Sequence, residues 1–572
     1  MTDKYELAQI FKNIAVLLEL KGENVFKARA YDTAARIVEQ METELTAATV
    51  DKALKGVKGI GPAISQKIHE YIDTGRIRYY EEIKAAVPPA LFELVRIPGL
   101  GPKKAVILYD KLGINSIGEL EYACRENRLV ALSGFGLKTQ AKILQGIKYM
   151  KKYQGKYILS DAWPVAELIA AYIRLQPGVE EAAIAGAVRR RVEIVDGIDI
   201  VVAVSASASL ITALQEMPGV EKMETGETLD LTMASGIHCR IFPVPPEKYG
   251  YTLFYRTGSP EYLAKLPQAA RPAGIGLTAA GLVRDNKVLE TPDEKSVYTQ
   301  MNIRYVEPEL REKEYDMEAD NGSLRPLLID EQDIRGIFHV HTTYSDGSHS
   351  LADMAAAARK RGLSYLGVAD HSQTAVYAHG LKIDKVYEQR QEIDALNSVQ
   401  PDFLILAGME SDILPDGSLD YPDDILAQFD FVIASVHSAF RQSESVMTRR
   451  IIRAMENPFV TMLGHATGRI LLARPGYEVN MKEILAAAKD TGTLMEINAS
   501  PYRLDLDWRW HQIAKENGIR FAINPDAHAI DELEHMRYGI AAARKGGLTA
   551  ADVINTRPIS RILHILQQKR KK

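Results

Sequence analysis

The chain has 572 residues, of which 46% are hydrophobic and 25% charged. This composition excludes a disordered or collagen-like chain, and at about 150 residues per domain the length predicts three to four domains. The two cysteines, Cys124 and Cys239, are too few for a disulfide framework or a cysteine-rich zinc module, and they favour a reducing compartment. The N-terminus is charged from its third residue, and no run approaches the roughly 20 apolar residues of a membrane helix. We therefore expect a cytoplasmic protein that does not bind membranes.

Charge and histidine are unevenly distributed along the chain. The formal net charge is −5, yet residues 1–156 carry 25 Lys and Arg against 18 Asp and Glu, a charge of +7. This bias alone is weak evidence for nucleic-acid binding, since a solvated lysine-rich helix face gives the same count. Histidine is more informative, because 11 of the 13 histidines lie in residues 333–572. Such a cluster favours metal or acid–base chemistry there.

Residues 1–156 are predicted to form short amphipathic helices, beginning with an apolar stripe at helical spacing. Three Gly-x-Gly turns each open a helix, at Gly59 and Gly61, Gly99 and Gly101, and Gly134 and Gly136. Such a turn lets a DNA phosphate approach the backbone N–H groups of a helix start. Lys103, Lys104 and Lys138 add positive charge nearby. A single copy is more often a tight helix–helix turn, but three copies favour sequence-independent DNA binding by helix-hairpin-helix units.

The pattern changes to an α/β one from about residue 157. The short runs EEAAIAG, GIDIVVAV and HCRIFPV are apolar or alternating, and we expect them to be strands of one sheet. The charged stretch that ends near residue 332 is interrupted by Asn-Gly and Pro, which is typical of an exposed linker.

Residues 333–572 alternate short apolar strands, such as LSYLGVAD, FLILAGME and RFAINPDAH, with helical stretches. This alternation predicts a (β/α) barrel, whose catalytic groups lie at the C-terminal ends of the strands. His339 and His341 are two residues apart on one strand, so both imidazoles lie on one face, as metal ligands do. Further strand ends carry polar groups that we expect to converge at one barrel mouth: Asp370, His371, Glu410, His437, His465, Asp526 and His528.

The helical arm resembles the small N-terminal domain of family X DNA polymerases, through the stretch Gly59-Ile-Gly-Pro-Ala-Ile-Ser-Gln-Lys67. In some members a lysine at the place of Lys67 forms a Schiff base with the sugar of an abasic site. The resemblance therefore implies lyase activity as one role of Lys67. A solvated or phosphate-contacting lysine is the other and more frequent role.

The next part resembles the palm and thumb of the same family, in Gly186-Ala-Val-Arg-Arg190 and in Tyr255-Arg-Thr-Gly258-Ser259. The family holds two Mg²⁺ ions with three aspartates, because Mg²⁺ prefers oxygen ligands. Alignment on Gly186 puts Gly197 and Asp199 on the first two aspartates and His238 on the third, so two of the three ligands are replaced. This departure implies a polymerase domain that has lost its Mg²⁺ site, and it argues against templated synthesis and dNTP binding.

The strand-end residues of the C-terminal part resemble the metal site of the PHP (polymerase and histidinol phosphatase) phosphoesterase family. The resemblance implies nine ligands: His339, His341, Asp346, His371, Glu410, His437, His465, Asp526 and His528. Six imidazoles with three carboxylates favour Mn²⁺ or Zn²⁺, with Fe²⁺ as a further option. Nine ligands exceed the needs of one ion, so we expect two or three ions, bridged by Glu410. Arg469, Arg474 and Arg503 are candidate phosphate ligands, although a surface salt bridge is as frequent a role for any one arginine.

The order of these parts is that of bacterial family X DNA polymerases with a C-terminal PHP domain. We place a lyase-like helix-hairpin-helix domain at 1–90, a fingers-like one at 91–156, a nucleotidyltransferase-like palm at 157–243, a thumb at 244–315, a linker at 316–332 and the PHP domain at 333–572. The expected protein is a monomer that processes DNA 3′ ends in base-excision repair.

Three functions stay open at this stage. The favoured one is a metal-dependent 3′-5′ exonuclease or 3′-end-processing phosphodiesterase, with abasic-site cleavage as a further activity, acting on gapped or nicked double-stranded DNA that an inactive polymerase core helps to bind. One alternative is an active gap-filling DNA polymerase with 3′-5′ exonuclease. The other is a DNA-binding scaffold with a small-molecule phosphatase barrel.

Overall fold

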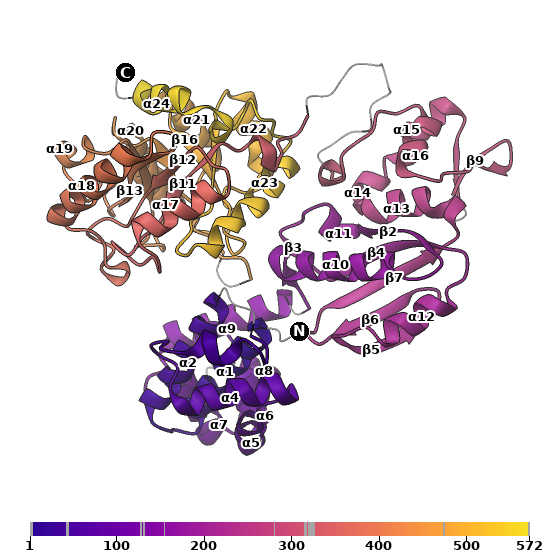
Figure 1. The fold of residues 1–572 in the computed structure, drawn as a ribbon, viewed down its shortest axis with the longest axis horizontal. Helices are drawn as coiled ribbons and strands as arrows, with labels where there is room; N and C mark the ends of the chain where they lie inside the picture. Colours follow the sequence, from indigo (N-terminus) through magenta and orange to yellow (C-terminus); the bar gives the residue numbers. More distant parts are fainter. Residues whose placement is uncertain are drawn as a thin grey trace. The chain divides into compact units, whose positions relative to one another are not determined.

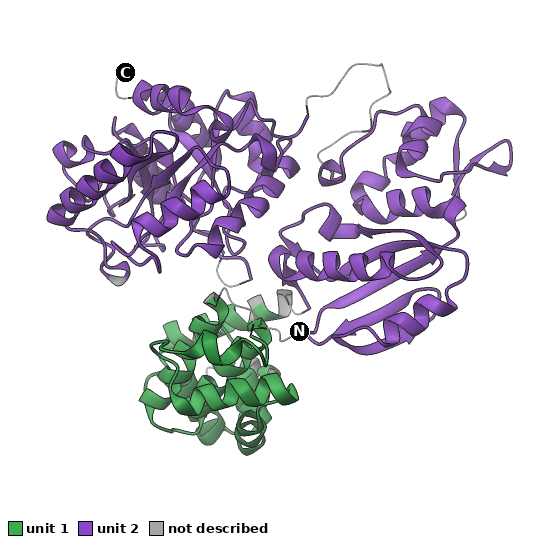
Figure 2. Ribbon diagram, in the orientation of Figure 1, with its two compact units in different colours: residues 1–154 green, residues 155–572 purple. Residues whose placement is uncertain are grey.

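The computed structural model (Figure 1) describes residues 4–41, 45–125, 129, 132–153, 155–278, 281–313, 317, 327–472 and 475–569. The chain forms two compact units, residues 1–154 and 155–572 (Figure 2). Within the described ranges, no helix combines the length and the apolar character that crossing a membrane requires.

The first unit consists of helices. They are α1 (Lys4–Leu20), α2 (Val25–Gln40), α3 (Val50–Leu54), α4 (Pro62–Thr74), α5 (Arg78–Ala86), α6 (Pro89–Leu94), α7 (Pro102–Leu112), α8 (Ile117–Arg125) and α9 (Leu137–Tyr153). In α1, Leu7, Phe11, Ile14 and Leu18 recur every three or four residues and are fully buried. This apolar stripe is the one that the sequence predicts, and it packs the helix into the core of the unit.

The three Gly-x-Gly turns share one backbone geometry. Their first glycines, Gly59, Gly99 and Gly134, have φ angles of 98°, 86° and 85°, a left-handed conformation that favours glycine. The second glycine of each turn directly precedes the first residue of α4, α7 or α9. Pro62 and Pro102 occupy the first position of α4 and α7, where their missing N–H costs no hydrogen bond. The prediction that each turn opens a helix is confirmed.

The second unit begins with a five-stranded sheet in the order β2-β4-β7-β6-β5. Its strands are β2 (Val179–Ala185), β4 (Ile198–Val204), β5 (Val220–Thr225), β6 (Leu229–Met233) and β7 (His238–Val244). The three runs predicted as strands are therefore β2, β4 and β7. A short pair, β1 (Tyr157–Ile158) and β3 (Ile194–Val195), and the helices α10 (Leu159–Arg174), α11 (Gly186–Arg189) and α12 (Ala208–Gln215) complete this palm region.

The central strand β4 is buried on both faces of the sheet. Ile200 and Val202 of β4 pack into one cluster with α10 and α12, whereas Val201 and Ala203 pack into another with Tyr249. This alternation follows from the two-residue period of a strand. It explains why the run GIDIVVAV is almost continuously apolar.

The thumb region follows the sheet. It contains α13 (Tyr249–Thr257), α14 (Pro260–Leu263), α15 (Leu266–Ala270), a small antiparallel sheet of β8 (Gly276–Thr278), β9 (Gly281–Arg284) and β10 (Lys287–Val288), and α16 (Glu294–Met301). The carboxylate of Glu294 lies 2.7 Å from Nη2 of Arg189 in the palm and 2.5 Å from Nη1 of Arg311, which is fully buried. The pair with Arg189 joins the thumb to the palm, and the pair with Arg311 lies within the thumb.

The rest of the unit is a seven-stranded parallel barrel in chain order. Its strands are β11 (Gly336–Val340), β12 (Tyr365–Val368), β13 (Leu404–Asp412), β14 (Phe431–Ser435), β15 (Met462–Leu463), β16 (Leu494–Asn498) and β17 (Phe521–Asn524). A bridge between Val340 and Ala527 nearly closes it. Its helices are α17 (Leu351–Lys360), α18 (Ile383–Val399), α19 (Asp423–Leu426), α20 (Glu444–Glu456), α21 (Met481–Thr491), α22 (His511–Glu516), α23 (Met536–Lys545) and α24 (Ile559–Gln568).

The packing of the barrel core leaves the carboxyl ends of the strands free for chemistry. Phe338, Tyr365 and Phe431 from three strands form one cluster with Ile562 and Leu566 of α24. Helix α24 thus packs on the strand residues of the barrel core, while the histidines follow the carboxyl ends of the strands. The predicted fold class, helix-hairpin-helix parts followed by palm, thumb and barrel, is confirmed.

Replacing Glu294 with Gln should destabilise the palm and thumb. Burial disfavours the charged carboxylate, but Arg311 and Arg189 outweigh it and hold the pKa of Glu294 below its ordinary value. Loss of one partner of a buried ion pair costs about 3 kcal/mol, so the variant should unfold at lower urea concentration. Because the folded pKa is lowered, the contribution in the wild type is present above the unfolded pKa and is lost as pH falls through the folded one.

The control for this experiment is Glu261→Gln, at an exposed thumb carboxylate. The stability of both variants is measured by urea unfolding between pH 7 and pH 3, with limited proteolysis of the palm and thumb as the readout. Equal stability of Glu294→Gln and Glu261→Gln at pH 7 would contradict the assigned role of the ion pairs.

Candidate metal centre

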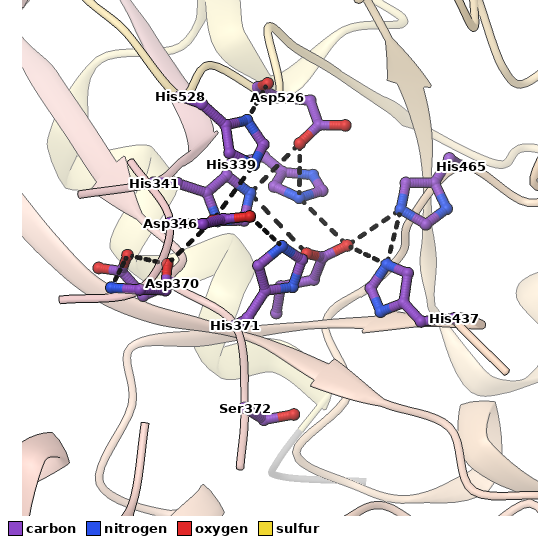
Figure 3. Close-up of polar contacts among 12 residues, drawn as sticks. His339, His341, Asp346, Asp370, His371, Ser372, His437, His465, Asp526 and His528 are labelled. Carbon is purple, nitrogen blue, oxygen red and sulfur yellow. Dashed lines mark hydrogen bonds and ion pairs between the residues drawn. The ribbon is translucent and has the colours of Figure 1, made fainter. Parts of the chain in front are cut away.

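All nine predicted metal ligands meet at the carboxyl ends of the barrel strands (Figure 3). His339 lies in β11 with His341 just after it, Glu410 lies in β13, and the others lie in the loops that follow their strands: Asp346, His371, His437, His465, Asp526 and His528. His339 and Asp526 have φ angles of 59° and 53°. Left-handed backbone at residues other than glycine is strained, and such strain concentrates at functional sites.

Glu410 is the centre of the cluster. Its Oε1 lies 3.0 Å from Nε2 of His465 and 3.3 Å from Nε2 of both His437 and His339. Its Oε2 lies 2.9 Å from Nδ1 of His371. The two oxygens therefore face different imidazoles.

Three overlapping groups have ligand atoms that all lie within 4.8 Å of one another. They are His341 with Asp346, His371 and His528; His339 with His341 and Asp526; and His371 with Glu410 and His437. Overlap of this kind, with His341 and His371 each in two groups, fits more than one ion.

The donor atoms fit divalent metal ions. His339 Nε2 and His341 Nδ1 are buried and have no hydrogen-bond partner among the described residues. Buried polar atoms are otherwise almost always hydrogen-bonded, so these nitrogens are available as ligands. Imidazole nitrogen mixed with carboxylate oxygen suits Mn²⁺, Zn²⁺ and Fe²⁺.

Electrostatics favour the ligand forms of His341 and Glu410. Burial, assisted by the neighbouring His528 and His371, lowers the pKa of His341 to about 3. Its imidazole is therefore neutral, as metal binding requires. Burial opposes ionisation of Glu410, but the surrounding imidazoles of His339, His437 and His371 outweigh it and hold the carboxyl pKa well below its ordinary value.

Glu496, which the sequence analysis does not single out, fixes two of the ligands. It is fully buried in β16, with Oε1 2.6 Å from Nδ1 of His339, and its Oε2 accepts a 2.7 Å hydrogen bond from the backbone N–H of His465. A carboxylate on the far nitrogen orients the ring and raises its basicity. The feature of the sequence that could have revealed Glu496 is a charged residue inside the apolar run TLMEINA.

Two aspartates support the other ligands. Asp412 lies 2.7 Å from Nδ1 of His437. Asp370 is fully buried and accepts hydrogen bonds from the backbone N–H groups of Thr342 and Ser345 and from the side chain of Gln389. It therefore fixes the loop that carries His341 and Asp346.

The candidate phosphate ligands differ in position. Arg503 Nε lies 3.5 Å from Oδ2 of Asp526, at the metal centre. Arg469 donates to the backbone carbonyls of Arg503 and Leu504 and forms a 2.5 Å ion pair with Asp507. Its guanidinium thus holds the backbone beside Arg503. Arg474 lies outside the described residues.

The residues aligned with the polymerase aspartates do not form a ligand cluster. Asp199 is paired with Arg240 at 3.1 Å, and a Cβ atom at Gly197 would lie only 2.7 Å from the carbonyl oxygen of His238. A carboxylate at position 197 therefore has no room in this backbone. Among the described residues, the groups that could hold a metal are all in the barrel.

The other palm and thumb signatures are engaged in structure. Arg190 forms a 2.9 Å ion pair with Glu312 and donates to the carbonyl of Thr257. Ser259 is buried and caps α14 by accepting from the N–H of Tyr262. Gly258 precedes it in close contact with Leu263, and Tyr255 is exposed.

The helical arm leaves its glycine turns open. A Cβ atom at Gly61, Gly101 or Gly136 would meet nothing within 4 Å. Lys103 and Lys138 are exposed, and Lys104 lies 5.7 Å from the ring centre of Phe135. Lys67 donates to the carbonyl of Ala63, with its ammonium 4.7 Å from the ring centre of Tyr79.

Comparison with known proteins agrees with this arrangement. A helix-hairpin-helix domain family matches residues 2–77, a SAM-like helix-hairpin-helix tandem matches 91–148, the DNA polymerase beta thumb matches 252–312 and the PHP domain matches 338–500. The DNA polymerase/3′-5′ exonuclease PolX of Bacillus subtilis (strain 168) is 35% identical over 573 residues, covering 99% of each chain. The chain belongs to the PolX family.

The barrel of this PolX chain also has shorter relatives. Probable phosphatases of Thermoanaerobacter sp. (strain X514) and Caldanaerobacter subterraneus subsp. tengcongensis are each 30% identical to it. The matches cover 41% of this chain and 95% and 91% of the two phosphatases. The resemblance to bacterial family X polymerases with a PHP domain is thereby confirmed.

Replacing Glu496 with Gln should weaken metal binding without unfolding the barrel. The amide keeps the volume but removes the charge that orients His339, a change that typically lowers metal affinity by about 10- to 100-fold. Calorimetric titration of metal-stripped protein with Mn²⁺ measures the effect. Glu456→Gln, at the exposed end of α20, is the control. Equal Mn²⁺ affinity of the two variants would show that Glu496 does not act on the ligands.

Proposed function

We propose that this PolX chain is a Mn²⁺-dependent 3′-5′ exonuclease that acts on gapped or nicked DNA, with a polymerase core that binds DNA but does not extend it. The proposal rests on the contrast between the barrel site and the palm site. The barrel gathers all nine candidate ligands into one cluster, in which each lies within 3.5 Å of at least one other, whereas the palm has Gly197 and His238 in place of two aspartates.

The residues of the barrel mouth suit hydrolysis of a phosphodiester. Bound divalent ions would supply positive charge for the phosphate oxygens and lower the pKa of a coordinated water. His339, Glu410 and His465 are almost fully buried, so this part of the site is shielded from bulk water, which strengthens its electrostatic interactions. Arg503 is placed beside Asp526 to hold a phosphate with its planar guanidinium.

The helical arm supports the DNA part of the proposal. Helix N-termini with open glycine turns bind single phosphates irrespective of base sequence. Three such turns would hold the duplex by its backbone and leave a free 3′ end for the barrel.

The second candidate function is that of a small-molecule phosphatase. The barrel is similar to proteins named probable phosphatases, and the matches cover most of the length of those proteins. The two functions differ in substrate, since a phosphatase cleaves a phosphate monoester and an exonuclease cleaves an internucleotide diester. The same preparations can be tested on both substrates.

The double variant His339→Ala, His341→Ala should lose the nuclease activity. Metal-stripped protein is incubated with a 5′-labelled one-nucleotide-gap duplex, with Mn²⁺ or Mg²⁺ and with or without dNTPs. The wild type should shorten the primer with Mn²⁺, stop on metal removal and never extend it, and the variant should leave the primer intact. His564→Ala, an exposed histidine of α24, is the control. Extension of the primer by the double variant and by His564→Ala would overturn the claim that the polymerase core is inactive. Cleavage of p-nitrophenyl phosphate without shortening of the primer would favour the phosphatase.

Alanine at Gly101 and Gly136 should weaken DNA binding while the fold remains stable. Neither glycine has a positive φ angle, and the added methyl group meets no neighbour. It would instead obstruct the approaching phosphate, so the plot of log K against log salt should become less steep by about 0.9 for each phosphate that is no longer bound. Fluorescence anisotropy with a gapped duplex at several salt concentrations measures this. Gly226→Ala, in an open turn of the palm, is the control; unchanged slopes would rule out phosphate binding at these turns.

A further inference from the structure

We infer that the altered nucleotide-binding loop of the palm positions the metal centre of the barrel, with Glu193 as the positioning residue. It does so by holding the barrel segment 503–509, which carries Arg503 to Asp526. This inference rests on the proposed nuclease function of the barrel. It gives the palm a role in the barrel reaction that requires no nucleotide.

Two residues of the barrel bind the side chain of Glu193. Its side chain is only 11% exposed, with Oε1 2.9 Å from Nη1 of Arg509, and its Oε2 accepts a 3.3 Å hydrogen bond from the indole N–H of Trp508. Both carboxylate oxygens are therefore committed to one short segment. Glu193 follows the arginines Arg189 to Arg191, so the contact is made by the loop that resembles the nucleotide-binding signature of family X.

Apolar side chains of the barrel extend this contact into the palm core. Leu504 and Leu471 belong to the same buried cluster as Ile198 and Ile200 of the central palm strand. Leu504 has a φ angle of 43°. A branched residue holds this left-handed conformation only where its surroundings fix it, and here the surroundings include the palm.

The same segment continues to the metal centre. Arg509 contacts Asp507 at 3.0 Å, and Asp507 contacts Arg469 at 2.5 Å. Arg469 donates a 2.9 Å hydrogen bond to the carbonyl of Arg503, whose guanidinium lies beside Asp526. Each link is a charged group with a defined partner, so a shift at Arg509 is transmitted to Arg503.

Asp505 makes a second connection to the same ligand. Its backbone carbonyl accepts a 2.6 Å hydrogen bond from the N–H of Asn498, and the Asn498 side chain donates a 2.9 Å hydrogen bond to Asp526. The position of segment 503–509 is therefore coupled to that of Asp526 through two connections, one from Arg503 and one from Asp505.

Lys545 anchors the other end of the palm loop. It is fully buried, donates to the carbonyl of Arg190, pairs with Glu312 at 2.5 Å and lies 4.7 Å from the ring centre of Trp508. Arg190 itself is paired with the same Glu312. The guanidinium that the family resemblance assigns to nucleotide binding is thus committed to the palm–barrel contact.

The chain offers a matched control for Glu193. Glu167 on α10 also forms a palm–barrel ion pair, with Arg537 at 2.9 Å. Arg537 lies on α23, outside segment 503–509. Glu167→Gln therefore removes a palm–barrel ion pair without touching the path to Asp526.

The experiment measures Mn²⁺-dependent shortening of the labelled gapped primer by the full chain and by Glu193→Gln, Arg509→Gln, their double variant and Glu167→Gln. We expect Glu193→Gln to lower kcat about tenfold, with KM within about twofold of the wild type. The double variant should be no worse than Arg509→Gln alone, because that change already breaks the contact with Glu193. Glu167→Gln should keep the wild-type kcat. A merely structural role would lower the melting temperature and leave the kcat of folded protein unchanged.

Trp508→Phe is the reserve variant if Glu193→Gln fails to fold, since it removes the N–H that donates to Glu193 and keeps an aromatic ring at this position. We expect it to lower kcat in the same direction. An active wild type with equal kcat for the Glu193, Trp508 and Glu167 variants would overturn this inference alone. A wild type without Mn²⁺-dependent nuclease activity would overturn the proposed function and this inference together.

Discussion

The barrel depends on one electrostatic constraint, the burial of negative charge at its mouth. Glu410, Glu496 and Asp526 are almost completely removed from water, and such charges are tolerated only with close cationic or donor partners. Imidazoles from five different strand ends meet this need. Their convergence requires parallel strands, because only then do all carboxyl ends face one side. The strained backbone at His339 and Asp526 is a further cost of bringing the groups together.

The palm and thumb use charge differently. There Arg189, Arg190 and Arg311 are paired with Glu294 and Glu312, so guanidiniums that could meet a triphosphate meet carboxylates of the same chain. The single remaining carboxylate of the aligned aspartates, Asp199, is paired with Arg240. The cationic groups of this region thereby stabilise domain contacts, and the reactive chemistry is concentrated in the barrel.

The sequence was sufficient for the fold class and for the expectation that the nine candidate ligands gather at one barrel mouth, because each lies near the end of a recognisable apolar strand. It was insufficient for Glu496, since one acidic residue inside a strand has no motif and only the folded barrel shows its contact with His339. Arg469 illustrates a second limit: its charge suggested a phosphate, whereas its position beside the carbonyls of Arg503 and Leu504 depends on a loop conformation that no spacing rule predicts. The pairing of Glu193 with Arg509 joins residues more than 300 positions apart, and without an alignment of related sequences such a pair leaves no local signal.

The packing of α24 has a consequence for biosynthesis. Ile562, Ile565 and Leu566 supply part of the cluster that contains Phe338 from the first barrel strand and Phe431 from the fourth. This cluster stays incomplete on the ribosome until residue 566 has left the exit tunnel. The helical arm, whose core draws only on earlier residues, can begin to fold while the barrel is still open. The strand ends that carry the candidate metal ligands are therefore complete only after the helical arm has been synthesised.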